Sequence, residues 1–365
     1  MKKKNIVHLV QDLETGGLEK VIKTIVTSID ARKYNIEVWC LASGGEIAEE
    51  IKREGIELKI LGLTNYHNPS SILKLTYLLK KHNIDIVHTH GYFANTFGRI
   101  SAFIGGIPKK IAHVHTIKKQ NPYIEKILSL VTDKIICISG AVQEFIIKEE
   151  GVKRNKTILI YNGIESPNIQ ADSNKGDTLK KSLDINKNDI VLVVIASLTK
   201  HKGHSFLINA FAQSFKNNQN LKLLIVGTGP LKDAILSQIR DQDLFTRAIL
   251  LGFRKEIMQL LSIADISILP SITKEGLGLA LIESIAMKKP VIGSNVGGIP
   301  EVIEDGVNGI VVPHSNVEKL AYAIDRLANN RELRKWMGET SGEIFKKKFT
   351  KSKMIYAIEK LYDEI

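Results

Sequence analysis

Short apolar segments alternate with amphipathic segments along most of the chain. The apolar, β-branched segments predict strands, and the segments between them have the spacing of helices. Strands that alternate with helices form parallel sheets. The pattern therefore predicts two α/β units, separated by a polar, turn-rich stretch at 166–188. The strands predicted in the two units are 5–10, 36–42, 84–90, 109–114, 133–139 and 156–162, then 189–197, 220–227, 247–252, 264–270, 289–294 and 308–313.

This alternation divides the 365 residues into four parts. We expect an N-terminal α/β domain at 1–165, a linker with a short helix at 166–188, a C-terminal α/β domain at 189–345 and a last helix at 346–365. A chain of this length suits two domains better than one core. Ligands of such sheets bind at the carboxyl ends of the strands. Two such units imply a cleft between them.

Glu275 and Glu283 stand on either side of a predicted helix start. Gly276 and Gly278 favour a loop, and the apolar segment after them reads as a helix that begins near Gly278. A helix N-terminus presents free N–H groups and seats anions. Glu283 lies among apolar neighbours, where a carboxylate needs a hydrogen-bond donor such as a ligand hydroxyl. The pair predicts a ligand site; the simpler alternative is a solvated Glu283 at the rim of an amphipathic helix.

The segment around these carboxylates resembles the signature of the retaining glycosyltransferases of family 4. That signature is a Pro-Ser pair, then E-G-x-G-x-x-x-x-E, then P-V-[IV] and G-G-[IL]-P-E. Here it reads Pro270-Ser271, Glu275 to Glu283, Pro290-Val291-Ile292 and Gly297-Gly298-Ile299-Pro300-Glu301. Further segments follow the family's order, among them the glycine loop within 9–25. The resemblance thus covers nearly the whole chain.

The resemblance implies the GT-B fold, with two Rossmann-like parallel-sheet domains facing across a cleft. The acceptor side would be 1–165, the nucleotide-sugar domain 189–345, and the helix at 346–365 would pack back on the N-terminal domain. It implies a retaining hexosyltransferase that uses a nucleotide diphosphate sugar. We expect a uridine nucleotide, and a glycan or lipid-linked acceptor in cell-envelope polysaccharide biosynthesis. Retention would follow from front-face attack, with the leaving phosphate accepting the acceptor's proton.

The resemblance also implies roles for individual residues. Lys202 matches the lysine that binds the diphosphate, where a point cation offsets developing charge. His115 matches the histidine that contacts the donor sugar, and Glu275 lies near the transferred sugar. We expect these three to be catalytic, with Glu283 on the ribose hydroxyls. The other expected donor-binding positions are Gly16, Gly17, Ser197, Phe253, Arg254, Gly276, Leu277 and Gly278.

Ser197 departs from the family's pattern, which often has an arginine in R-L-x-x-x-K-G. One phosphate cation is missing there, so Lys200, His201 or an N-domain lysine substitutes, or phosphate neutralisation is weaker. A non-catalytic relative that binds a nucleotide sugar and supports a partner therefore stays open. The stretch 227–229, Gly-Thr-Gly, hints at an NAD(P)-dependent oxidoreductase, but the third glycine of GxGxxG is absent.

Histidines recur at the ends of the predicted strands 84–90 and 109–114. Alternation along a strand places His113 and His115 on one face. For His88, His90 and His113, a histidine satisfied at a strand end is the structural alternative to a functional role. His88 and His90 have a spacing that suits a metal, but neither an acidic nor a cysteine partner accompanies them. The family needs no divalent metal for the diphosphate, so we expect no metal and no cofactor.

Composition narrows the class of protein. Charged residues at 25% and hydrophobic residues at 44% are typical of globular domains. We see neither a membrane-spanning apolar run nor a secretory signal, and we expect Cys40 and Cys137 to be buried thiols of a cytoplasmic protein. The net charge of +12 and a basic helical pattern at 71–82 suggest an anionic membrane surface as a partner. No nucleic-acid motif is present. The basic residues in one N-domain segment are Lys109, Lys110, Lys118, Lys119, Lys126 and Lys134.

Overall fold

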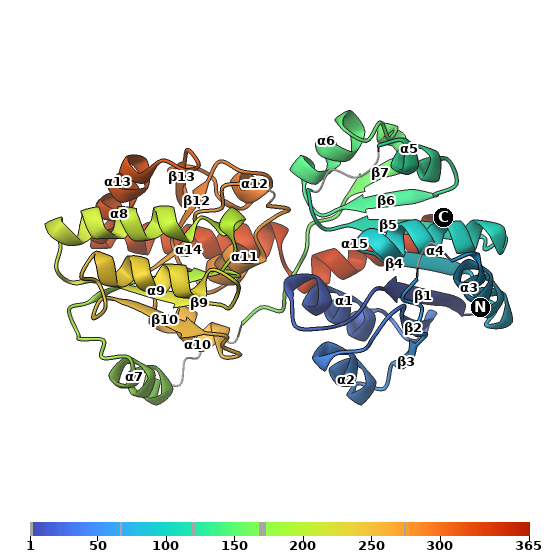
Figure 1. The fold of residues 1–365 in the computed structure, drawn as a ribbon, viewed down its shortest axis with the longest axis horizontal. Coiled ribbons are helices and arrows are strands. Elements are labelled where there is room, and N and C mark those ends of the chain that lie inside the picture. Colours follow the sequence, from blue (N-terminus) through green and yellow to red (C-terminus); the bar gives the residue numbers. More distant parts are fainter. Residues whose placement is uncertain (1–2, 66–67, 118–121, 168–172, 274) are drawn as a thin grey trace. The chain divides into compact units, whose positions relative to one another are not determined.

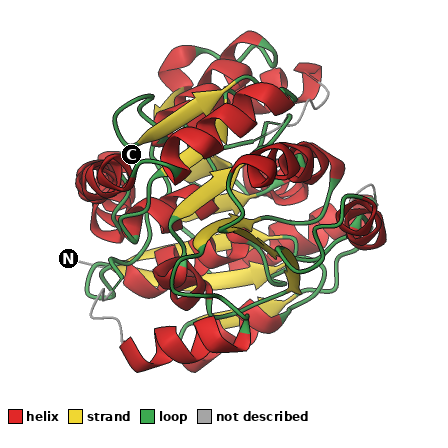
Figure 2. Ribbon diagram, turned by 90° about the vertical axis from the view of Figure 1, so that its left-hand side faces the viewer, coloured by secondary structure: helices red, strands yellow, loops and turns green. Residues whose placement is uncertain are grey.

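The computed structural model describes residues 3–65, 68–117, 122–167, 173–273 and 275–365. The chain forms two compact units, one of Met1–Ile164 with Lys351–Ile365 and one of Glu165–Thr350. Each unit contains one parallel sheet with helices packed on it (Figure 1). Figure 2 shows the helices in red on either side of the yellow strands. This is the pair of parallel α/β sheets that the sequence predicts.

The N-terminal unit has seven parallel strands in the order β3-β2-β1-β4-β5-β6-β7. Val7 and Leu9 of β1 pack with α3 and α4, whereas Val10 packs with α1 and α2, so the sheet is covered on both faces. The strands are β1 (Lys4–Val10), β2 (Tyr34–Cys40), β3 (Glu57–Ile60), β4 (Ile86–His90), β5 (Lys109–Val114), β6 (Lys134–Cys137) and β7 (Thr157–Leu159). The helices are α1 (Gly17–Ser28), α2 (Glu46–Arg53), α3 (Pro69–Lys81), α4 (Tyr92–Ile104), α5 (Pro122–Leu130), α6 (Gly140–Lys148), the 3-10 turn η1 (Arg154–Lys156) and α15 (Lys351–Glu364).

The C-terminal unit has six parallel strands in the order β10-β9-β8-β11-β12-β13. Leu192 and Val194 of β8 pack with α8, α9 and α13, and Val191 and Val193 pack with α10 on the other face. The strands are β8 (Ile190–Ile195), β9 (Leu221–Val226), β10 (Ala248–Gly252), β11 (Ile266–Leu269), β12 (Val291–Ser294) and β13 (Gly309–Val312). The helices are α7 (Ser173–Ser182), the 3-10 turn η2 (Lys200–Lys202), α8 (His204–Asn217), α9 (Lys232–Asp241), α10 (Ile257–Ile263), α11 (Leu279–Ala286), α12 (Ile299–Val302), α13 (Val317–Ala328) and α14 (Arg331–Lys348).

The last helix, α15, packs on the N-terminal unit, as expected. Tyr362 is fully buried there, and its hydroxyl lies 2.6 Å from His88 Nδ1. The expected start of this helix at residue 346 differs from the structure. Because Phe345 is buried in the C-terminal unit, α14 continues through it to Lys348, and α15 begins only at Lys351.

Both sheets contain a point where the strand order reverses, between β1 and β4 and between β8 and β11. The chain leaves two neighbouring strands there toward opposite faces of the sheet. This leaves a crevice at their carboxyl ends, where ligands of open α/β sheets bind. Each unit therefore has one place where a ligand site is expected.

The predictions about basic residues, thiols and membrane spans concern other parts of the molecule. The basic pattern at 71–82 falls on α3, whose Leu75 and Leu79 are buried while its lysines are exposed. Cys40 and Cys137 are buried free thiols, as predicted. Lys118 and Lys119 lie outside the described residues. Among the described helices, none has both the length and the apolar character needed to cross a bilayer.

Candidate functional site

In the C-terminal unit, the loops after β8 and β11 are fastened together. The N–H of Ile272 donates to the carbonyl of His201 at 2.8 Å. Gly203 lies between η2 and α8 with a φ of +73°, and a Cβ added there would lie 2.0 Å from the carbonyl oxygen of Pro270. Only glycine combines that backbone conformation with so close an approach. The fastening holds Lys202 against the loop that carries Glu275.

Lys202 and Glu275 form an ion pair at this junction. Lys202 Nζ lies 2.6 Å from Glu275 Oε2, and the hydroxyl of Ser271 donates to the same oxygen at 2.8 Å. Glu275 is only 8% exposed, so its carboxylate depends on these two partners. Two expected catalytic residues are thus brought together. Ser271 was missed as a functional residue, although the Pro-Ser pair of the signature contained the signal.

The glycine loop after Glu275 leads directly into α11. Gly278 has a φ of +88° and precedes the first helical residue, Leu279, as the sequence predicts. The N–H of Gly298 donates to the Glu275 carbonyl at 3.1 Å, and a Cβ on Gly298 would lie 2.3 Å from the Gly276 carbonyl oxygen. Gly298 therefore supports the loop from behind, a role that sequence reasoning did not give it.

Other expected donor residues lie around this loop. Glu283 is half-buried on α11, one turn inside the helix. Ser197 is exposed just after β8, and His204 Nε2 lies 3.0 Å from its carbonyl oxygen. The hydroxyl oxygen of Ser197 lies 3.3 Å from that of Thr199. The missing arginine is thus replaced by a chain of neutral polar groups that reaches His201.

Phe253 and Arg254 follow β10, the edge strand. Phe253 is 50% exposed, and Arg254 pairs with Glu256 at 3.0 Å. Since β9 lies between β10 and β8, these residues are at the periphery of the carboxyl edge rather than at the reversal point. That Phe253 and Arg254 lie near the base of the nucleotide stays a prediction.

The Gly-Thr-Gly stretch at 227–229 has a packing role. A Cβ on Gly227, whose φ is +143°, would lie 2.0 Å from the Ala196 carbonyl oxygen. The N–H of Leu198 donates to the Thr228 carbonyl at 2.8 Å. A Cβ on Gly229 would lie 2.6 Å from the Leu198 carbonyl oxygen. These contacts join the loops after β8 and β9, and they account for the two glycines without a dinucleotide.

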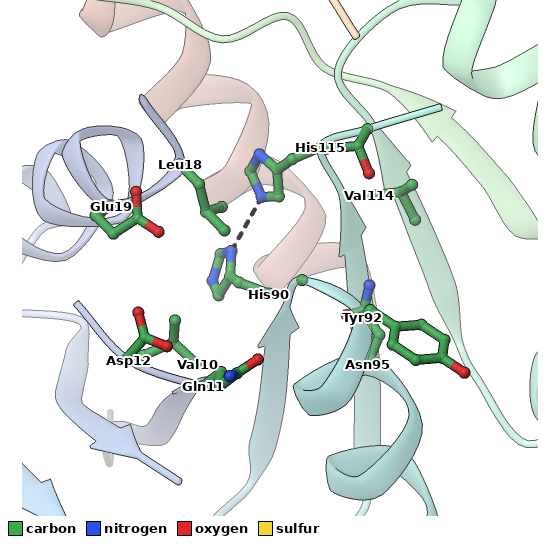
Figure 3. Close-up of a pocket in the computed structure, with 12 residues that line it drawn as sticks. Val10, Gln11, Asp12, Leu18, Glu19, His90, Tyr92, Asn95, Val114 and His115 are labelled. Atoms are coloured by element: carbon green, nitrogen blue, oxygen red, sulfur yellow. Dashed lines mark hydrogen bonds between the residues drawn. The ribbon is translucent and has the colours of Figure 1, made fainter. Parts of the chain in front are cut away.

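In the N-terminal unit, a pocket of about 230 Å³ lies at the other reversal point, where β1 meets β4 (Figure 3). His115 and His90 line it, with the carboxylates of Asp12 and Glu19. Gly16 caps α1, the helix that brings Leu18 and Glu19 to the pocket. Burial raises the pKa of Glu19, and the nearby carboxylates of Asp12 and Glu14 add to the rise. His115 therefore faces a cavity, whereas its contact with a sugar stays a prediction.

Behind the pocket, His115 belongs to a cluster of buried histidines. The rings of His113 and His115 stack with centroids 4.1 Å apart, which confirms that they share a face. Burial lowers the pKa of His8 and His115 to about 3, and it lowers the pKa of His88, His90 and His113 well below the usual value. Near neutral pH the rings are uncharged. His115 can therefore offer the pocket a hydrogen bond but no positive charge.

Known proteins resemble the chain along most of its length. Residues 15–166 match the model of Glycosyltransferase Family 4, and residues 176–343 match that of Glycosyl transferases group 1. The UDP-Gal:alpha-D-GlcNAc-diphosphoundecaprenol alpha-1,3-galactosyltransferase of Escherichia coli is 26% identical over 334 residues, which are 87% of this chain and 86% of the relative. The N-acetyl-alpha-D-glucosaminyl L-malate synthase of Bacillus anthracis is 29% identical over 302 residues, 80% of this chain and 78% of the relative. The crystal structure of Anabaena Alr3699/HepE in complex with UDP has a TM-score of 0.88 at 22% identity, covers 99% of this chain and 100% of its own, and has the same fold.

Proposed function

Because the chain belongs to glycosyltransferase family 4 and has the GT-B fold, we propose that it transfers a hexosyl group from a nucleotide diphosphate sugar with retention of configuration. The observation that carries this proposal is the Lys202–Glu275 pair, held with Ser271 where β8 and β11 diverge. A fixed cation beside a helix N-terminus suits a leaving diphosphate.

Lys202 is the proposed diphosphate ligand. Its ammonium group donates to Glu275 Oε2 at 2.6 Å, so the position of the cation is fixed by the protein itself. Preorganised charge stabilises a developing anion without reorganisation during the reaction. The N–H groups of Gly276, Leu277 and Gly278 would add the positive end of α11, with Glu275 near the sugar and Glu283 on the ribose. Gly16 and Gly17 would contact the diphosphate from the N-terminal unit.

His115 is proposed to contact the transferred sugar as a neutral hydrogen-bonding group. A pKa of about 3 makes it a poor base for the acceptor's hydroxyl at neutral pH. This agrees with front-face attack, in which the leaving phosphate accepts that proton. NMR of the product would test it, because an inverted anomeric configuration would refute the mechanism.

For the donor and acceptor we propose a UDP-sugar and a glycan or lipid-linked acceptor of the cell envelope. The name of the Escherichia coli relative specifies UDP-Gal and a diphosphoundecaprenol-linked acceptor, and that of the Bacillus anthracis relative specifies L-malate. Acceptors thus differ among relatives of similar identity. The proposal of a lipid-linked acceptor rests on the name of the Escherichia coli relative and on the surface of α3.

We propose that this surface contacts the cytoplasmic face of an anionic membrane. Leu73 and Tyr77 are each 62% exposed on α3, close in sequence to the exposed Lys74 and Lys81. Apolar side chains among lysines are typical of surfaces that bind anionic lipid. Sedimentation with anionic liposomes should show binding that weakens at high salt. Equal sedimentation with and without liposomes would refute the proposal.

A donor screen tests the main proposal. The purified protein would be incubated with UDP-, GDP-, ADP- and dTDP-sugars, and thermal stability and nucleoside diphosphate release would be followed. We expect one UDP-sugar to stabilise the protein and to be slowly hydrolysed. Ser197 favours a second candidate, a non-catalytic relative, because no cation stands at that position. Stabilisation with no release, even with envelope lipid extract as the acceptor source, would favour that relative. No stabilisation by any donor would refute both.

A further inference from the structure

Five buried histidines, on three neighbouring strands or directly after one of them, form one cluster in the N-terminal unit. The register of the sheet pairs His8 of β1 with His88 of β4, and His90 of β4 with His113 of β5. The centroids of neighbouring rings lie between 4.1 and 5.6 Å apart. The members are His8, His88, His90, His113 and His115, each 8% exposed or less.

One side of the cluster is linked by hydrogen bonds, although His88 Nε2 has no partner among the described residues. The hydroxyl of Tyr362 lies 2.6 Å from His88 Nδ1 and 3.3 Å from His8 Nε2, and His8 Nδ1 lies 2.9 Å from His90 Nε2. The single hydroxyl proton belongs to the shorter contact, so His8 Nε2 donates to Tyr362. A neutral His8 then accepts at Nδ1 from His90 Nε2. This leaves His90 Nδ1 with its lone pair directed toward His115.

On the other side, His90 Nδ1 lies within hydrogen-bond distance of His115 Nε2, but further nitrogens of the described residues lack partners. Among the residues that the structure describes, neither nitrogen of His113 has a hydrogen-bond partner, and His115 Nδ1 has none either. Buried polar atoms without partners cost free energy. His115 lines the pocket and is the most exposed residue of the cluster, and the ring of His113 stacks on it from the buried side.

The spacing of the unsatisfied side fits a metal ion. One nitrogen each of His90, His113 and His115 lies within 4.8 Å of the others, and His90 Nδ1 and His115 Nε2 are 3.3 Å apart. Tetrahedral zinc with Zn–N distances of about 2.0–2.1 Å places its ligand nitrogens about 3.3 Å apart. His8, His88 and His90 also have nitrogens within 4.8 Å of one another. There, however, the 2.9 Å between His8 and His90 and the 2.6 Å between His88 and Tyr362 are distances of hydrogen bonds.

Charge and access also suit a cation. Neutral imidazole is a common ligand of zinc, copper and nickel. Asp12 and Glu19 line the adjoining pocket and can offset a double positive charge. The pocket provides a route of entry and room for a fourth ligand, such as water. The His8 contact would act as the outer-shell bond that orients His90.

We propose that His90, His113 and His115 bind a divalent transition-metal ion of the zinc type, with its fourth position toward the pocket. The binding does not rest on the proposed function. If His115 contacts the donor sugar as proposed, the same ion would also inhibit transfer, because it would occupy the His115 ring.

Co²⁺ is the probe, since tetrahedral Co²⁺ with nitrogen ligands absorbs in the visible range and Zn²⁺ displaces it. The protein would carry no histidine tag and would be treated with a chelator first. We expect one equivalent of Co²⁺ to give a tetrahedral spectrum that Zn²⁺ abolishes. His113→Leu should weaken binding by at least the roughly 10- to 100-fold that loss of an outer-shell partner costs. The matched control is His88→Leu, a buried member of the same cluster outside the proposed ligand set, which should bind within a few-fold of wild type.

Three results would overturn the proposal: no stoichiometric Co²⁺ binding by wild type, equal affinities of the two variants, or loss of binding only in His88→Leu. Thermal unfolding without metal would establish that both variants fold. If His113→Leu does not fold, His115→Ala at the pocket provides the same test, with Co²⁺ binding as the readout. A folded His115→Ala that binds as tightly as wild type would also overturn the proposal.

Discussion

In the C-terminal unit, Lys202 and Glu275 meet as an ion pair on two loops, whereas in the N-terminal unit five histidines stand uncharged on one face of a sheet. Both groups lie beside a reversal of strand order. The loop site depends on glycines that let two backbones approach, and the strand site depends on register. The first therefore offers preformed charge, and the second offers a neutral polar surface whose removal disturbs the core.

This comparison predicts where a substitution acts. A change in the loop pair should affect turnover more than stability, because the charges act on a ligand. A change deep in the histidine cluster should affect stability first, because its atoms have little water around them.

Lys202→Ala should give the largest effect, a fall in kcat of about 100- to 1,000-fold, or about 4 kcal/mol at most, which is typical for loss of one preorganised charge stabiliser. The proposed diphosphate cation is removed, and Glu275 is left with Ser271 alone among the partners described above. The rate of nucleoside diphosphate release measures kcat. Lys216→Ala, an exposed lysine in the last turn of α8, is the matched control and should retain wild-type kcat. A loss of less than tenfold in Lys202→Ala would remove Lys202 from the mechanism.

The sequence predicted most strands because a buried parallel strand is a nearly continuous apolar run. It missed β3 (Glu57–Ile60), an edge strand whose residues are exposed or half-buried and alternate in charge and polarity. It could not predict that Lys202 and Glu275 touch, since this depends on β8 lying next to β11 and on a backbone bond between their loops. The start of α15 was placed too early because helical periodicity does not register the burial of Phe345.

The histidine cluster shows the same limit of prediction from a local sequence pattern. Alternation predicted that His113 and His115 share a face, because that follows from one strand alone. The participation of His8 required the pairing of β1 with β4, and that of Tyr362 required a helix from the far end of the chain. Contacts between distant segments are set by topology, which a local pattern does not contain. The roles given to His115, Lys202 and Glu275 stay predictions.

Gly203→Ala should destabilise the protein by about 3 kcal/mol, combining positive-φ strain with overpacking against the Pro270 carbonyl. It should also lower kcat, because Lys202 adjoins the displaced residue. Gly306→Ala is a matched control, since Gly306 has a φ of +74° but no atom within 4 Å of the added Cβ. It should cost only about 1 kcal/mol. Urea unfolding measures both, and equal losses would show that the fastening of the two loops is unimportant.

Tyr362→Phe should destabilise the protein by about 2 kcal/mol, because His88 Nδ1 and His8 Nε2 lose their hydroxyl partner inside the core. Its donor-dependent kcat should remain close to that of wild type, in contrast to Lys202→Ala. Tyr356→Phe on the same helix is the control, since Tyr356 is 69% exposed and should cost almost nothing. Urea unfolding of the two variants gives the difference, and a Tyr362→Phe variant as stable as Tyr356→Phe would contradict it.

The smallest expected effect is a change in the pH dependence of stability. The folded-state pKa of His88 is well below that of the unfolded chain, which is 6.5, so below this pH the unfolded state binds more protons. The free energy of unfolding therefore falls as the pH falls below about 6.5. His88→Leu removes one such proton. Below about pH 6.5, the free energy of unfolding of this variant should therefore fall less steeply than that of wild type, by about 1 kcal/mol per pH unit. Above about pH 7 the two curves should run parallel, because His88 is neutral in both states.

Carboxylates titrate in both proteins alike and cancel in the comparison. Curves that stay parallel down to pH 5 would mean that His88 becomes protonated in the folded protein, and the cluster would then be a charged site like the loop pair rather than its opposite.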